Sequence, residues 1–432
     1  MATCPFCGGV HKVGFVSTRL AGTDGVSLET YKWADVFEQE GLNSYFFAGE
    51  LDTPPERSYL VPEAHFIHPD IRAIYRQSFG VRTRPREITA EIGRLTHILK
   101  EHLYRFIDAF GIELLVPENA LTIPLNIPLG VALTQLISET GIPVIAHHHD
   151  FFWERQHFKV NAVWDYLNMA FPPHLPSIEH VVINSSGDNQ LSLRTGISGH
   201  IIPNVMDFEN SPAAPDTYAD DVRRSFGLED DDVFVLQPTR VVKRKGIEHA
   251  IELVHRLGMK AKLVISHASG DEGYDYERRV REYSKLMKVD TVFVANIINE
   301  HRGTTPNGRK IYTLNDIYPF ADLVTYPSNF EGFGNAFLEA IYFKKPIVVN
   351  TYSIYTMDIK PKGFDVIEID GYVTDEAVAK TREILENPTR RAAMVNKNYD
   401  IARRCYSYSV LRHRLRPLIH DRVACIPGTS LT

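Results

Sequence analysis

Short apolar runs alternate along the chain with segments whose apolar residues recur at helical spacing. In the first half of the chain, the runs predict buried strands at residues 11–19, 44–50, 113–119, 143–150 and 180–186. The helical patterns between them lie at residues 26–40, 86–110 and 128–140. Strands that alternate with helices indicate an α/β architecture, with a parallel sheet covered by helices on both faces.

The alternation stops at residues 202–216, a stretch with several Pro and Asp residues, and then starts again. The second set of predicted strands lies at residues 233–240, 261–266, 290–296, 321–327, 345–350 and 365–370. The second set of predicted helices lies at residues 246–258, 274–287, 334–343 and 376–387. The pattern therefore predicts two doubly wound domains, with a cleft between the carboxyl ends of their strands.

The expected domain bounds follow from this break in the pattern. Residues 1–205 form the predicted N-terminal domain, and residues 206–405 form the predicted C-terminal domain. We expect residues 406–432 to form a C-terminal helix that returns to the N-terminal domain. Its apolar pattern, at residues 407–422, contains Pro417, which predicts a kink or a break in the helix.

Composition is that of a soluble globular protein of about two domains, with 432 residues, 44% of them hydrophobic and 23% charged. The net charge of −7 argues against nucleic acid as a partner. No apolar run is long enough to span a bilayer, and the N-terminus lacks a secretory signal pattern, so we expect a cytoplasmic protein. Cys4, Cys7, Cys405 and Cys425 could in principle supply a zinc site, but reduced thiols without a role are the preferred interpretation.

The segment "NFEGFGNAFLEA" (329–340) follows an apolar strand and leads into a helix. Glu331 and Gly332 fall in the turn, whereas Asn335 and Glu339 are four residues apart and share one face of the helix. Two carboxylates and several backbone N–H groups thus gather at the positive end of a helix. Such a site suits a ligand that carries both hydroxyl groups and phosphate.

Three other interpretations of this segment are weaker. A dinucleotide-binding fingerprint would need a third glycine where Phe337 stands. A retaining-hydrolase pair would need its carboxylates closer than the roughly 10 Å expected between Glu331 and Glu339. In the third interpretation, Glu339 is simply a solvated helix residue.

A basic segment, "PTRVVKRKG", follows the first strand of the second domain. Arg240, Lys243, Arg244 and Lys245 bring four cations to the start of a helix, where they oppose the helix dipole. A bound polyanion would remove this conflict, although a solvated basic turn is the alternative. In the first domain, Gly22 and Gly25 occupy the loop before a helix, and this loop also suits close approach to a phosphate or sugar.

The strand at residues 143–150 ends in three histidines and Asp150. Adjacent side chains on a strand point to opposite faces, so the three imidazoles cannot all bind one metal ion, and we predict no metal site. One imidazole is expected to face the cleft as a hydrogen-bonding group. Beyond the strand, Arg155 and Lys159 could contact an acceptor substrate.

Taken together, these segments resemble the GT4 family of retaining glycosyltransferases, which have the GT-B fold. The resemblance covers most of the chain and is densest in residues 233–350. The loop Ala21-Gly22-Thr23 departs from it, because the family commonly has two adjacent glycines there.

The resemblance implies a role for each matching residue. Glu331 would bind donor-sugar hydroxyls, Glu339 the ribose, and Arg240 and Lys245 the diphosphate. His149 would contact the donor sugar, with His148 as the alternative. The remaining implied donor contacts are Gly22, Gly25, Gly332, Phe333, Gly334 and Asn335.

The implied reaction moves a hexose from a nucleoside diphosphate sugar, of the UDP-glucose or GDP-mannose type, to a small polar or carbohydrate acceptor. Retention of configuration is expected, and neither a cofactor nor a metal is needed. The one D-x-D pattern, Asp230 to Asp232, precedes a strand and is interpreted as a solvated turn rather than a metal site. A nucleotide-sugar 2-epimerase and a non-catalytic nucleotide-sugar-binding module remain as alternatives.

Overall fold

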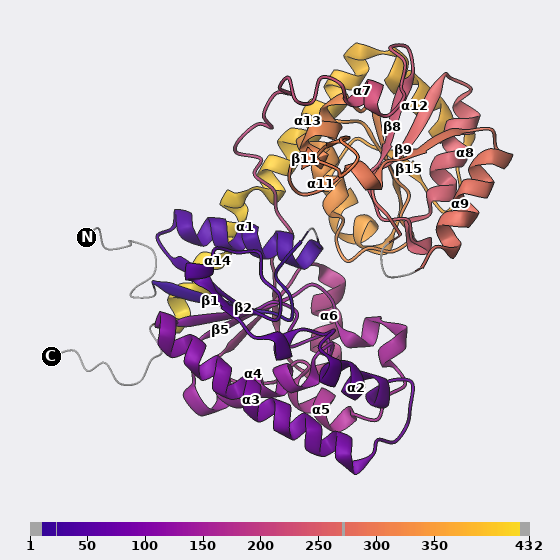
Figure 1. Ribbon diagram of the computed structural model, residues 1–432. Coiled ribbons are helices and arrows are strands. Elements are labelled where there is room, and N and C mark those ends of the chain that lie inside the picture. Colours follow the sequence, from indigo (N-terminus) through magenta and orange to yellow (C-terminus); the bar gives the residue numbers. More distant parts are fainter. Residues whose placement is uncertain (1–10, 23, 270–272, 424–432) are drawn as a thin grey trace. The chain divides into compact units, whose positions relative to one another are not determined.

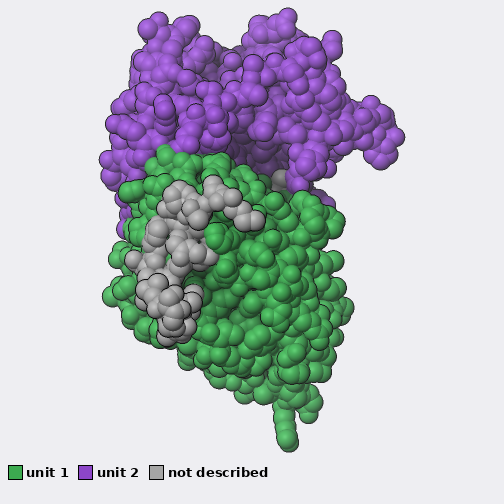
Figure 2. All heavy atoms as spheres, turned by 90° about the vertical axis from the view of Figure 1, so that its left-hand side faces the viewer, with its two compact units in different colours: residues 1–205, 408–432 green, residues 206–407 purple. Residues whose placement is uncertain are grey.

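The computed structural model describes residues 11–22, 24–269 and 273–423 (Figure 1). The chain divides into two compact units (Figure 2). The first unit ends at Val205 and takes up the chain again from Tyr408, and the second comprises Met206–Ser407. The C-terminal helix thus belongs to the first unit, although it follows the second unit in the sequence.

The first unit is built on a seven-stranded sheet in the order β3-β2-β1-β4-β5-β6-β7, and its neighbouring strands pair in parallel. The strands are β1 (Lys12–Val16), β2 (Asn43–Ala48), β3 (Ser58–Leu60), β4 (Leu114–Pro117), β5 (Val144–His148), β6 (Ile178–Val182) and β7 (Gly199–Ile201). The α-helices are α1 (Gly25–Gln39), α2 (Pro69–Ser78), α3 (Arg86–Phe110), α4 (Ile127–Thr140), α5 (Trp164–Ala170), α6 (Ser185–Thr195) and α14 (Tyr408–Val423).

The second unit is built on a six-stranded parallel sheet in the order β10-β9-β8-β13-β14-β15, with a separate antiparallel hairpin. The strands are β8 (Val233–Gln237), β9 (Ala261–Ile265), β10 (Asp290–Phe293), β13 (Leu323–Tyr326), β14 (Ile347–Asn350) and β15 (Ile367–Ile369), with β11 (Gly303–Thr304) and β12 (Lys310–Ile311) in the hairpin. The α-helices are α7 (Val222–Ser225), α8 (Ile247–Leu257), α9 (Asp275–Leu286), α10 (Leu314–Ile317), α11 (Asn335–Tyr342), α12 (Asp375–Glu386) and α13 (Pro388–Tyr406).

Both sheets carry buried side chains on two faces, because successive residues of a strand point to opposite sides. On β4, Leu114 and Val116 pack in one cluster with Trp33 of α1. Leu115 packs in another cluster, with Phe106 of α3. The cluster on the α1 side also includes residues of α14, so the last helix packs beside α1 and completes that face (Figure 1).

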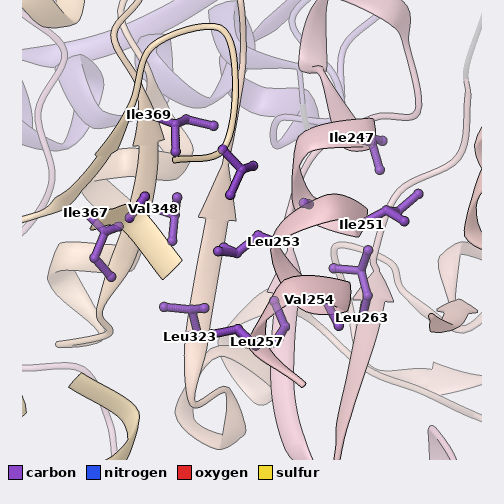
Figure 3. Packing of buried hydrophobic residues seen from close by; sticks show 14 of the residues in the cluster. Ile247, Ile251, Leu253, Val254, Leu257, Leu263, Leu323, Val348, Ile367 and Ile369 are labelled. Atoms are coloured by element: carbon purple, nitrogen blue, oxygen red, sulfur yellow. The ribbon is translucent and has the colours of Figure 1, made fainter. Parts of the chain in front are cut away.

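In the second unit, one face of the sheet is covered by α8 and α12. Ile247, Ile251, Val254 and Leu257 of α8 recur at helical spacing and pack onto strand residues such as Leu263 (Figure 3). This packing fixes where α8 begins, and therefore where the turn between β8 and α8 lies. That turn contains the basic residues of the predicted diphosphate site.

The predicted fold class is confirmed, since both units are doubly wound parallel α/β domains. All eleven predicted strands and all seven helices predicted between them are present, with ends shifted by a few residues. Two three-residue strands, β3 and β7, were not predicted, because so short a run carries no periodic signal. A kink or a break was predicted at Pro417: the break is wrong, since α14 is one helix that contains this residue, and the kink stays a prediction.

The structure describes only part of the residues on which the membrane and cysteine expectations depend. Among residues 11–22, 24–269 and 273–423, no helix combines the length and apolar character needed to cross a membrane. Cys405 is a free cysteine, and Cys4, Cys7 and Cys425 lie outside the described residues.

The turn between β8 and α8 gives the first prediction. Gly246 has φ +57°, and a methyl group there would lie 2.5 Å from the carbonyl oxygen of Pro327, the residue after β13. Gly258, at the other end of α8, has φ +62° but open space around it. Gly246→Ala should therefore lower the free energy of unfolding by on the order of 1–3 kcal/mol more than Gly258→Ala. Both substitutions place an alanine in a left-handed backbone conformation, but only the methyl group at position 246 clashes with a neighbour.

Urea denaturation of the two variants measures this difference. Equal losses of unfolding free energy in Gly246→Ala and Gly258→Ala would show that a methyl group at position 246 does not clash with Pro327.

Candidate active site

The carboxyl ends of β8 and β13 lie next to each other in the second sheet, at the point where the strand order reverses. Ligands of open parallel sheets bind outside the carboxyl ends of the strands at such a point. Two loops meet there, residues 238–246 after β8 and residues 327–334 after β13. The backbone N–H of Asn329 donates to the carbonyl oxygen of Arg244 at 2.8 Å, so the loops are joined directly.

Glu331 lies at the centre of this junction and is only 8% exposed. Lys245 Nζ donates to one carboxylate oxygen, and Arg244 Nη1 donates to the other at 3.0 Å. Burial alone raises the pKa of Glu331, but the two cations outweigh it and hold this pKa below its usual value. Glu331 is therefore ionised at neutral pH, as one member of a three-residue ion cluster.

The cations around Glu331 differ in exposure. Lys245 is buried, with Nζ 5.4 Å from the centre of the Tyr326 ring, whereas Arg240 is exposed. Burial lowers the pKa of Lys245, and Glu331 acts against this shift. Arg240, Arg244 and Lys245 together exceed Glu331 by two positive charges, and the exposed Lys243 of the same loop adds a third. An anionic ligand can balance this charge.

The glycine-containing segment after Glu331 is held close to β14. Tyr352 donates from its hydroxyl to the carbonyl oxygen of Phe333 at 2.7 Å. Gly334 has φ +126°, and a methyl group there would lie 2.5 Å from the same hydroxyl. Helix α11 then begins at Asn335 without a side-chain cap and without an acidic residue in its first turn. Its positive end is thus left without a carboxylate from its own first turn.

Glu339 lies one helical turn after Asn335. Tyr318 donates from its hydroxyl to Glu339 Oε2 at 2.8 Å. The ring of Tyr318 is fully buried and stacks on Phe343, with 4.9 Å between the ring centres. The carboxylate is therefore fixed by a rigid, neutral partner, in contrast to Glu331, which is fixed by cations.

In the first unit, His149 follows the end of β5 and bonds to a buried carboxylate. His149 Nε2 is 3.0 Å from Glu118 Oε2, and His147 Nδ1 is 2.9 Å from the same oxygen. Glu118 is fully buried, which raises its pKa to about 7. Burial lowers the pKa of His147 to about 4, and the Trp33 ring stacks on it with 4.1 Å between the ring centres.

His148 points to the other face of the sheet, where its Nε2 is 2.9 Å from Nδ1 of His180. The prediction that the three adjacent histidines cannot meet at one point is confirmed. Within the described part of the chain, Glu118, His147 and His149 are the group whose donor atoms come close enough to hold a metal ion. The same atoms lie at hydrogen-bond distances, so the three side chains contact one another directly. Among the described residues, Nε2 of His147 is buried and has no hydrogen-bond partner.

The other predicted residues of the first unit lie in loops at the carboxyl ends of strands. The N–H of Gly22 donates to Asp52 at 2.9 Å, and Gly25 is the first residue of α1, which Asp24 caps. Arg155 pairs with Asp150, and Lys159 is exposed.

Three contacts of these networks were not predicted. Arg244 stands in the basic segment, but its contact with Glu331 depends on the turn that Gly246 makes possible. Glu118 stands at the end of an apolar run. A carboxylate at such a place is expected to be buried, and this was the signal of function that the sequence offered. Tyr352, which holds the glycine segment, carries no such signal.

Comparisons with known proteins agree with this geometry. Residues 219–400 match the family model described as glycosyl transferases group 1. The chain is 30% identical over 380 residues to a mannosylglucosylglycerate synthase of Petrotoga mobilis, covering 83% of this chain and 86% of that protein. It is also 30% identical over 436 residues to a mannosylglucosylglycerate synthase of Thermotoga maritima, covering 92% and 96%.

Among solved structures, a glycosyltransferase from Rickettsia africae superposes with a TM-score of 0.67 at 12% identity, over 97% of this chain and 100% of that one. That likeness concerns the fold, which is GT-B. The sequence relationship goes further, because both synthases match nearly the whole chain: this protein belongs to the group 1 glycosyl transferases.

Proposed function

We propose that this glycosyltransferase moves a mannosyl residue from a nucleoside diphosphate mannose to glucosylglycerate or a closely similar acid, with retention of configuration and without a metal ion. The observation that most strongly supports a nucleoside diphosphate sugar as the donor is the buried Glu331 with its cations. Mannose as the transferred sugar comes from the names of the two synthases. Both reactants are small and water-soluble, which fits our expectation of a cytoplasmic enzyme.

The charge of the junction suits a nucleotide sugar. The diphosphate of such a donor is a diester with two negative charges, and Arg240, Arg244 and Lys245 exceed Glu331 by two positive charges. We assign Arg240 and Lys245 to the diphosphate. Fixed cations of this kind stabilise the charge that develops on a departing nucleoside diphosphate, which is the task a metal performs in other transferases.

The two glutamates take different parts of the donor in this proposal. Glu331, at the end of the loop, binds hydroxyl groups of the transferred sugar, together with backbone groups of Gly332, Phe333, Gly334 and Asn335. Glu339, further along α11, binds the ribose hydroxyls, and Tyr318 keeps its carboxylate in place. His149 is assigned to the donor sugar, with Gly22 and Gly25 as further donor contacts.

The acceptor assignment rests on the names of the two synthases. A product called mannosylglucosylglycerate consists of a mannosyl group joined to glucosylglycerate, and we transfer that acceptor class to this chain. Its carboxylate requires a cation, for which the first unit offers Arg155 and Lys159. Arg155 is shared with Asp150, whereas Lys159 is exposed.

The acceptor and the stereochemistry can be tested together. Purified protein with GDP-mannose and glucosylglycerate should give an α-linked mannoside. The anomer is read from the one-bond coupling between C1 and H1 of the mannosyl group in the NMR spectrum. Glucosylglycerol, in which a hydroxymethyl group replaces the carboxylate, is the matched control acceptor. It should react about 10–150-fold less efficiently, since hydrogen bonds to a charged group contribute about 1.5–3 kcal/mol.

A β-linked product would contradict retention, and equal rates with the two acceptors would contradict recognition of the acid. UDP-glucose in place of GDP-mannose tests the other donor type. Conversion of the donor to a different sugar nucleotide without any acceptor would favour an epimerase instead.

Separate roles for the two glutamates predict different kinetic defects. Glu331→Gln should lower kcat by about 10²–10³-fold, because a preorganised contact at the reacting sugar is lost. Its affinity for GDP should fall much less than its kcat, because the cations assigned to the diphosphate are still present. Glu339→Gln is the matched variant, because it makes the same substitution in the helix that follows the loop with Glu331. It should instead raise the KM for the donor by about tenfold or more. The same defect in both variants would argue against the division of roles.

Catalysis without a metal is tested by the initial rate in excess EDTA. The rate should be unchanged, whereas Lys245→Met and Arg240→Met should each lose about 10–150-fold, because each removes a charge-assisted contact to the leaving group. Activity that disappears in EDTA and returns with Mg²⁺ or Mn²⁺, while both variants stay near the wild-type rate, would refute this mechanism.

A further inference from the structure

His267 lies beside the basic loop but has no part in the assignments above. It follows β9, the neighbour of β8 in the sheet, at the carboxyl end. Two backbone bonds flank it: the N–H of Ser266 donates to Gln237 at 3.3 Å, and the N–H of Val241 donates to the carbonyl of Ala268 at 3.2 Å. His267 is therefore held alongside the segment that contains Arg240.

The orientation of the ring is set by its neighbour. Ser266 Oγ is 2.8 Å from His267 Nδ1, and Ser266 is itself 1% exposed. When the hydroxyl donates to Nδ1, the ring proton of the neutral imidazole lies on Nε2. Among the described residues, Nε2 has no hydrogen-bond partner, so it is available to donate to a ligand.

The charged groups that face His267 are Arg240, from the loop after β8, and Lys245, from the turn before α8. Burial, together with these two cations, lowers the pKa of His267 to about 4. Lys245 is in turn paired with Glu331. The imidazole is thus neutral in the free protein at neutral pH, next to cations that repel a proton.

We propose that His267 is a further ligand of the donor's diphosphate and that it takes up a proton when the donor binds. The inference rests on the proposed donor site. A diphosphate next to Arg240 and Lys245 offsets their repulsion and offers an oxygen atom to Nε2. Both effects favour the imidazolium form. The protonated ring then interacts more strongly with the diphosphate as its negative charge grows during departure of the sugar.

The direction in which donor affinity changes with pH follows from the linkage between proton binding and donor binding. A histidine whose pKa rises on binding takes up protons in the complex, so donor affinity increases as the pH falls toward the pKa of the complex. The Kd should therefore be lower at pH 6 than at pH 8, and the proton uptake that accompanies binding should be larger at pH 6.

Calorimetry without acceptor measures this uptake directly. GDP-mannose, and separately UDP-glucose, is titrated into the protein in buffers of different ionisation enthalpy at pH 6 and pH 8. A nucleotide sugar suits this purpose because its diphosphate is a diester and does not titrate in this range. Protons taken up therefore come to the protein.

Three variants complete the experiment. His267→Gln should bind the nucleotide sugar with no proton uptake from this site, and its Kd should depend less on pH than that of the wild-type protein. His267→Asn is the second variant, in case the first does not fold. His255→Gln is the matched control, because His255 is an exposed histidine of the same unit and its replacement should leave the wild-type profile intact.

The outcomes separate the two proposals. If the nucleotide sugar binds but the wild-type protein and both His267 variants take up the same number of protons, His267 is not the group that titrates and the inference is overturned. If neither nucleotide sugar binds the wild-type protein at all, the proposed donor is wrong, and the inference falls with it.

Discussion

A carboxylate removed from water requires partners, because an isolated buried charge costs several kcal/mol or more. Glu331 meets this requirement through Lys245 and Arg244, which come from a different loop. The pairing joins the loops after β8 and β13 and fixes the turn that Gly246 makes against Pro327. Glu331, Lys245 and Arg244 are therefore held in place before any ligand arrives, and the arrangement of the two loops depends on this one interaction.

Preorganisation of this kind suits a reaction in which negative charge moves onto a leaving group. Cations that are already fixed need no rearrangement at the moment of reaction, and they act more strongly where water is excluded. The internal carboxylate prevents the cations from repelling one another in the empty site. The carboxylate of the second glutamate, Glu339, accepts a hydrogen bond from a buried tyrosine hydroxyl, which orients it. The two acids are thus suited to different ligand groups by the chemistry of their partners.

Much of this organisation could be predicted from the sequence. The alternation of apolar runs and helical patterns was enough for both parallel sheets, since buried strands and amphipathic helices leave strong periodic signals. The loop that contains Glu331 and the basic turn that contains Lys245 were also identified as parts of one site. What the sequence could not supply were contacts between distant segments. The bond from Arg244 to Glu331 joins residues 87 positions apart, and the bond from His149 to Glu118 joins residues 31 positions apart. No local pattern encodes either bond, and the same is true of Tyr352, whose position follows only from the pairing of β13 with β14.

The central claim is that Glu331 and Lys245 are coupled in the free protein. A double-mutant cycle measures this coupling through the unfolding free energy of Lys245→Met, Glu331→Gln and the double variant. Glu331→Gln leaves the buried Lys245 without its carboxylate, and Lys245→Met leaves Glu331 with Arg244 as its remaining cation. Each single substitution should cost about 3 kcal/mol, whereas the double variant should recover most of that loss. Additive losses in the double variant would contradict the claim, because they would mean that the two side chains do not neutralise each other in the folded protein.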